Sequence, residues 1–169
     1  LPSPSSAPIV DSTAGWKTFS EPTYGFEYKY PPEAEVVDTG VSSGQYKLLF
    51  VGQKQIASGR TQTSLFDGYI FNISVRGKVS ETTIDQIANE TYEATKSSCE
   101  QAQLSPISVV MMGSISAKTY TVTNCMGDYT ATFVSDGKNV FELTQLYTGE
   151  PVDQPQYQQI TNQIISTFT

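Results

Sequence analysis

Apolar and polar residues alternate over several short stretches of the chain, which is the pattern of strands with one buried face. Residues 26–30 place three aromatic side chains on one face and Glu27 and Lys29 on the other. Two prolines follow, and because proline has no N–H to donate to a neighbouring strand, the strand ends there. The same pattern predicts further strands at 16–20, 45–51, 69–76, 107–112, 118–123, 129–134 and 140–147.

Two other stretches have the period of an amphipathic helix. Between 83 and 102, small and apolar residues recur every three or four positions, and Thr83 with Gln86 forms a capping-box pattern at the start. A second helix is predicted over 155–168, where a proline suits the first turn. The stretch 52–64 is polar, and we interpret it as a loop.

This order of elements predicts an α+β fold, with a central antiparallel sheet flanked by two main helices. The length of 169 residues suits one domain and a short extra piece. We place the domain at 15–169. Residues 1–14 contain a tract rich in proline and serine, and we interpret them as a flexible linker.

The composition excludes several classes of function. The chain has no histidine, which rules out a histidine-based catalytic triad, metal cage or pH switch. Its net charge of −7 argues against nucleic acid as a partner. No run of 18 apolar residues occurs, so we expect contact with a membrane only through an anchor upstream of Leu1.

The chain has two cysteines, Cys99 in the predicted helix and Cys125 at the end of a predicted strand. One disulfide between them would stabilise the fold by roughly 3–4 kcal/mol, because it restricts the unfolded chain. Two separate buried thiols are the alternative. A disulfide and a Pro/Ser tether both suit an extracytoplasmic protein, whether secreted, periplasmic or anchored at the cell surface.

Three segments carry a resemblance to a known family: GWKTF at 15–19, YGFEYKYP at 24–31 and IISTF at 164–168. They resemble PsbP-like domains, the group related to the lumenal extrinsic protein of photosystem II, many of whose bacterial members are exported. The resemblance implies an antiparallel sheet with helices covering its faces, and it implies no catalytic residue. Some photosynthetic members interact with metal ions partly through histidine, so we transfer none of those sites to this chain.

Glu33, Glu35 and Asp38 form a local acidic cluster. Carboxylate oxygens that lie close together on a loop can hold a divalent cation. The three residues lack the spacing of a calcium loop, however, and a solvated acidic loop is the alternative interpretation. They are therefore only weak candidates for a metal site.

Trp16 and Tyr24 belong to an aromatic stretch near the start of the domain and are candidates for an interface, since aromatic side chains anchor many interfaces. In a protein rich in sheet, such residues more often belong to the core and its rim. The polar stretch 52–64 carries Lys54 and Arg60 and is either a loop that faces a partner or a plain loop.

We therefore predict a non-enzymatic, exported interaction module, tethered at the cell envelope and binding a protein partner. One alternative is an accessory protein that binds a small ligand or a divalent cation. A second alternative is a hydrolase that uses a pair of carboxylates. The sequence predicts no catalytic residue and no cofactor.

Overall fold

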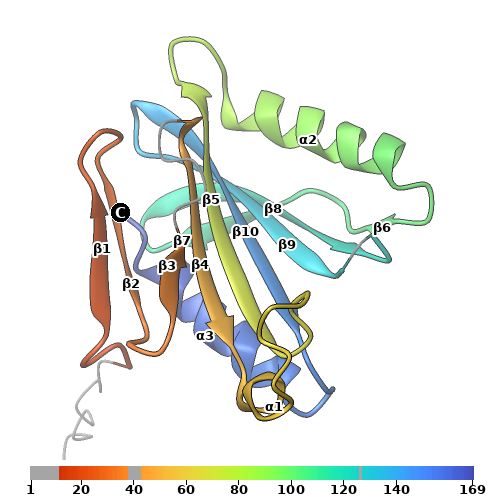
Figure 1. The fold of residues 1–169 in the computed structure, drawn as a ribbon. Helices are drawn as coiled ribbons and strands as arrows, with labels where there is room; N and C mark the ends of the chain where they lie inside the picture. Colours follow the sequence, from red (N-terminus) through yellow and green to blue (C-terminus); the bar gives the residue numbers. More distant parts are fainter. Residues whose placement is uncertain (1–11, 38–42, 126) are drawn as a thin grey trace, which may run out of the picture.

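Two antiparallel sheets carry most of this computed structural model, which describes residues 12–37, 43–125 and 127–169 (Figure 1). The smaller sheet is the hairpin of β1 (Lys17–Glu21) and β2 (Phe26–Tyr30). The other strands are β3 (Glu35–Val37), β4 (Gln45–Val51), β5 (Gly68–Lys78), β6 (Gln103–Leu104), β7 (Ser108–Met112), β8 (Ile115–Thr123), β9 (Tyr129–Ser135) and β10 (Asn139–Thr148).

In the described residues, these eight strands form one sheet in the order β3-β4-β5-β10-β9-β8-β6, with β7 also pairing with β8. Every pairing is antiparallel. The strands predicted from alternation are confirmed, and β8 and β5 extend beyond their predicted bounds. The antiparallel, sheet-dominated α+β architecture is therefore as predicted.

Three helices accompany the sheets in the described part of the chain: α1 (Gln53–Ala57), α2 (Ile84–Ser98) and α3 (Gln154–Ser166). The prediction of two flanking helices is thus only roughly right. The α1 helix lies within the stretch 52–64 that was predicted as a loop. At five residues it is too short to form from propensity alone, so contacts from other parts of the chain must hold it.

The capping box of α2 is confirmed. The Thr83 hydroxyl accepts from the Gln86 N–H at 3.2 Å, and the Gln86 side chain accepts from the Thr83 N–H at 3.1 Å. The helix ends at Ser98 rather than at 102, because the chain turns at Cys99. That residue forms a disulfide with Cys125, across a Cα–Cα distance of 5.8 Å, so the predicted disulfide is present.

The helices cover different parts of the large sheet. On one face α2 packs on β8 and β9, where Ile87 and Ala88 meet Tyr120, Val122 and Phe133. On the other face α3 packs on β10 and β5 and also contacts β2, over a core rich in aromatic residues. On this second face, Ala117 of β8 and Val134 of β9 belong to that core, whereas Thr121, toward the other end of β8, is exposed.

The last residues of the chain join α3 to the small sheet. Glu27 and Thr169 exchange two backbone hydrogen bonds of 3.0 Å, and the Lys29 N–H donates to the Thr167 hydroxyl at 2.8 Å. Phe168 stacks on Phe26 at a centroid distance of 5.6 Å. The C-terminal segment thereby fixes the hairpin against the core.

Two further observations concern the predicted linker and membrane contact. Of the linker at 1–14, residues 1–11 lie outside the described residues, and Thr13 belongs to a turn whose carbonyl accepts from the Trp16 N–H at 3.0 Å. Among the helices of the described chain, none has the length and apolar character needed to cross a membrane.

Candidate functional site

A groove opens where neighbouring strands of the large sheet end at different levels. β9 begins at Tyr129, which lies opposite Leu146 of β10. β10 continues past this point, and Tyr147 and Thr148 still pair with β5 on their other side. Toward β9 these two residues have no strand partner in the described chain, and this leaves a notch at the end of the sheet.

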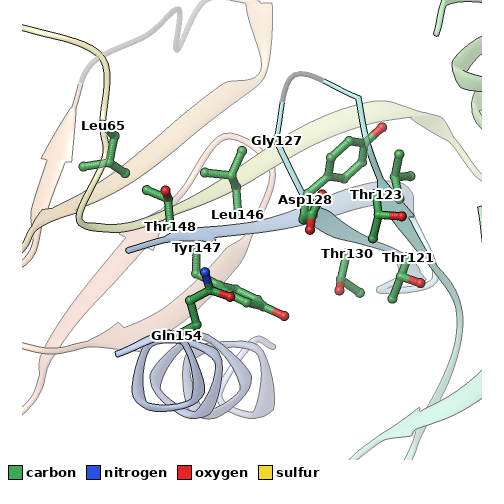
Figure 2. A pocket seen from close by; sticks show the side chains of 12 residues that line it. Leu65, Thr121, Thr123, Gly127, Asp128, Thr130, Leu146, Tyr147, Thr148 and Gln154 are labelled. Carbon is green, nitrogen blue, oxygen red and sulfur yellow. The ribbon is translucent and has the colours of Figure 1, made fainter. Parts of the chain in front are cut away.

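This notch is a pocket bounded by described residues, with a volume of about 490 Å³. We call it the β10 groove (Figure 2). Threonine, tyrosine, glutamine and aspartate side chains dominate its lining, and lysine and arginine do not contribute to it. The lining residues are Leu65, Thr121, Val122, Thr123, Gly127, Asp128, Tyr129, Thr130, Leu146, Tyr147, Thr148 and Gln154.

The alternation of side chains along the strands decides which groups face the same side. Figure 2 shows Thr121, Thr130 and Tyr147 on the side of the sheet that carries α3, with Gln154 reaching toward Tyr147 from the first turn of that helix. Leu146 points to the opposite side. Thr121 and Thr130 are directly paired across β8 and β9, so their hydroxyl groups lie side by side.

These hydroxyl groups differ from others of the same type in the chain. Thr119 donates to the Ala131 carbonyl at 2.9 Å, and Thr167 donates to the Ile164 carbonyl at 2.8 Å. The side chains of Thr121, Thr130 and Tyr147, by contrast, make no hydrogen bond within the described residues. These three hydroxyl groups are therefore available to a ligand or to water.

Asp128 is the carboxylate of the groove. Its Oδ1 accepts the backbone N–H of Asn124 at 3.1 Å, which closes the turn between β8 and β9. Burial, and next the charge of Asp128, raise the pKa of the Tyr147 phenol. Tyr147 therefore keeps its proton at neutral pH and can both donate and accept a hydrogen bond.

The wall that carries Leu65 is held by Gln55, a fully buried residue of α1. Its amide group donates to the carbonyls of Arg60 and Ser64, at 3.2 and 3.4 Å. Its side-chain oxygen accepts the N–H groups of Phe66 and Asp67, at 2.9 and 3.2 Å. One glutamine thus organises the polar stretch after α1, which is consequently an ordered wall rather than a plain loop.

Asp67 in turn holds α1. Its carboxylate is 2% exposed and accepts the backbone N–H groups of Lys54 and Gln55, at 2.9 and 3.4 Å. It also accepts the Tyr157 hydroxyl of α3 at 2.7 Å. The first-turn N–H groups of a helix need such acceptors, and here the acceptor comes from a residue well beyond the helix. The cap residue itself is Gly52, which has no side chain to offer.

Lys54 and Arg60, the predicted partner-facing residues, are in different situations. The Lys54 ammonium forms ion pairs of 2.6 Å with both Glu150 and Asp153, in the turn before α3. The Arg60 guanidinium lies 5.3 Å from the centroid of the exposed Phe66 ring. Lys54 therefore helps to dock α1 on α3, and a role for Arg60 toward a partner stays a prediction.

The structure describes only part of the predicted cation cluster. Glu33 and Glu35 are both exposed, and Asp38 lies outside the described residues. No group of three or more acidic or cysteine side chains with the geometry of a metal site occurs within 12–37, 43–125 and 127–169. A cation at Glu33, Glu35 and Asp38 stays an untested prediction.

Trp16 and Tyr24, the predicted interface residues, are both half-buried against the aromatic core. Tyr24 meets the ring of Tyr46 edge-on, at a centroid distance of 6.5 Å. The structure thus places both residues at the rim of the core, where part of each ring remains exposed. Their use as an interface stays a prediction.

Sequence reasoning missed the residues of the β10 groove. The threonines at 119, 121 and 123 alternate with residues on the α2 side, and this alternation is visible in the sequence. It does not show whether a helix covers that face. Nor does it show that Leu65 and Gln154, from distant segments, stand at the same end of the sheet.

Comparisons with known proteins show the fold. No family model and no curated protein matches the chain. The solution structure of cyanobacterial PsbP (CyanoP) from Synechocystis sp. PCC 6803 is similar, with a TM-score of 0.58 and 19% sequence identity over 98% of this chain and 97% of that one. The chain therefore has a PsbP-like fold, as the sequence resemblance implied.

A protein of Bacteroides thetaiotaomicron VPI-5482, known from a crystal structure, also matches. The two sequences are 13% identical, with a TM-score of 0.49. The match covers 90% of this chain and 47% of the other, so this chain spans about half the length of that protein.

Proposed function

We propose that this chain is a non-enzymatic interaction module that binds its partner in the β10 groove. One observation carries the proposal: hydroxyl groups of Thr121, Thr130 and Tyr147, all without an internal partner, meet in one open groove on a paired sheet. Polar groups held by a rigid scaffold in this way recognise a ligand without having to order flexible segments first.

The chemistry of the groove favours binding over hydrolysis. A hydrolase that works with carboxylates needs two of them facing one another across the substrate. Asp128 is the one acid among the described residues that line the groove, and one of its oxygens already closes a turn. The same reasoning disfavours Ca²⁺, which takes six to eight oxygen ligands and usually several carboxylates among them.

We further propose that the module works outside the cytoplasm. The Cys99–Cys125 disulfide supports this, because such bonds persist in oxidising compartments. The Pro/Ser-rich tract at 1–8 supports a tether at the cell envelope, since this composition cannot form a packed core.

Site-specific crosslinking in the source cells tests the proposal. A photoreactive benzoylphenylalanine in place of Leu65 stands at the wall of the groove, and one in place of Glu93 stands on the exposed side of α2. We expect a discrete crosslinked species from position 65 and none from position 93. Equal crosslinking from both positions, or none from position 65, would contradict the proposal.

A further inference from the structure

We propose that the β10 groove binds a neutral, hydroxyl-rich ligand, that is, a short stretch of glycan. The inference rests on the proposed function of this groove as the binding site. It adds the chemical class of what is bound, which follows from the type of hydrogen-bonding groups, from the charge of the lining and from the aromatic side chain in it.

The hydrogen-bonding groups are of the kind that match other hydroxyls. A hydroxyl donates one hydrogen bond and accepts two, whereas a phosphate or a carboxylate ligand only accepts. Thr121 and Thr130 present two hydroxyls side by side across β8 and β9, and Tyr147 presents a third on the same face. A ligand whose neighbouring groups also both donate and accept satisfies all of them, and a sugar ring has this property.

The charge of the lining argues against an anionic ligand. No lysine or arginine is among the described residues that line the groove, and Asp128 adds a negative charge at one end. Phosphorylated, sulfated and acidic ligands would be repelled there. Asp128 suits a neutral ligand, because the carboxylate accepts hydrogen bonds from hydroxyl groups.

The aromatic and apolar groups suit the other surface of a sugar. The half-buried ring of Tyr147 offers a flat apolar face, against which the C–H groups of a sugar ring can pack. Leu65 and Leu146 are the main aliphatic groups of the lining. They form no deep socket for the apolar side chain that a peptide usually anchors. The volume of about 490 Å³ lies within the usual range of small-ligand pockets, about 300–1,000 Å³, and leaves room for a short oligosaccharide.

Titration of the purified chain with a panel of neutral oligosaccharides tests the inference. The panel contains gluco-, manno- and galacto-oligosaccharides and those built from N-acetylglucosamine, and NMR spectra of the chain report which residues respond. We expect at least one series to shift the signals of Thr121, Thr130 and Tyr147. Because no cation of the protein takes part, we expect the affinity to stay within about twofold as salt rises from about 0.05 to 0.5 M.

Three variants separate recognition from folding. Thr130→Val keeps the shape and removes one hydroxyl, and we expect about two- to tenfold weaker binding. Tyr147→Ala removes the flat face, and we expect a loss of about tenfold or more. Thr18→Val, at an exposed threonine of β1, is the matched control and should bind like the unmodified chain. Equal affinity of Thr130→Val and Thr18→Val would overturn the inference.

A second experiment identifies the source of the glycan. It also separates failure of the glycan inference from failure of the proposed function. The source cells are treated with glycosidases, and the crosslinking from position 65 is then repeated. Loss of capture after this treatment supports a glycan, carried by a glycoprotein if the captured species is also sensitive to protease and by a polysaccharide if it is not. Capture that survives the treatment, with no response to the panel, overturns the glycan and leaves the interaction module standing. Absence of both capture and response overturns both.

Discussion

Replacing Asp67 with alanine should destabilise the fold more than any exposed substitution. Its buried carboxylate joins three segments, because it accepts two N–H groups in the first turn of α1 and the Tyr157 hydroxyl of α3. Asp67→Ala removes the cap of α1 and leaves a buried phenol without a partner. The helix then has no acceptor for its first turn, since Gly52 provides none.

The expected loss follows from these two effects. A helix cap contributes about 1 kcal/mol, and a buried hydroxyl left without its partner costs about 1–3 kcal/mol. We therefore expect Asp67→Ala to lower the free energy of unfolding by about 3 kcal/mol, against a total of about 5–15 kcal/mol for a typical domain. For a chain of 169 residues, this corresponds to a fall in Tm of about 6–12 °C.

A double-mutant cycle with Gly52→Ala tests the proposed cause. A Cβ atom at position 52 would overlap the carboxyl group of Asp67, so Gly52→Ala must displace that group and lose the same hydrogen bonds. Its φ of −73° is ordinary, so the penalty is steric and not conformational. We expect Gly52→Ala to be about as harmful as Asp67→Ala in the native background, and nearly harmless once Asp67 is alanine.

Urea unfolding followed by circular dichroism measures all four corners of the cycle. Glu93→Ala, on the exposed side of α2, is the control and should change stability by less than about 0.5 kcal/mol. The reasoning is refuted if the two single changes add within about 0.5 kcal/mol, or if Asp67→Ala costs no more than the control.

Three further predictions concern other contacts. Reducing the disulfide between Cys99 and Cys125 should lower the free energy of unfolding by roughly 3–4 kcal/mol, measured by urea unfolding with and without reductant; an unchanged midpoint would contradict this. Burial raises the pKa of Tyr46 and of Tyr120 to about 12, so above pH 10 these phenols ionise first in the unfolded chain. The free energy of unfolding should then fall by about 1.4 kcal/mol per pH unit for each tyrosine up to about pH 12. We expect tyrosinate absorbance to rise cooperatively as the circular dichroism signal is lost. A smooth titration of the tyrosines with the fold intact would refute this prediction. Lys54→Met should shift Tm far less than Asp67→Ala despite its two short ion pairs, because Lys54 is exposed; equal shifts in thermal melts would show that these pairs matter more than exposure suggests.

The position of α1 shows where reasoning from periodicity stops. Residues 53–57 carry no amphipathic period and no local cap, so a loop was the reasonable prediction for them. The acceptor for the first turn is Asp67, which follows the helix by ten residues. The buried Gln55 in the same segment looks like any surface glutamine in the sequence, because its four partners are main-chain groups.

The candidate site shows the same limit. Thr121 and Thr130 lie on strands that the sequence predicts, but the sequence does not show that their face of the sheet borders a groove. Whether such a face is covered depends on where α3 crosses the sheet. The notch forms because β10 continues for two residues beyond its last pairing with β9. Neither property belongs to any single segment.

The amino-acid sequence alone determined the longer strands, the two longer helices, the capping box and the absence of histidine chemistry, but not the short strands β3 and β6. These are local properties: the alternation of side chains, the 3.6-residue period and the hydrogen-bonding capacity of neighbouring residues. The tertiary structure alone decided that a distant aspartate caps α1 and that unpaired hydroxyls converge beside α3. Such arrangements arise only when segments far apart in the chain pack together, so no stretch of sequence contains them.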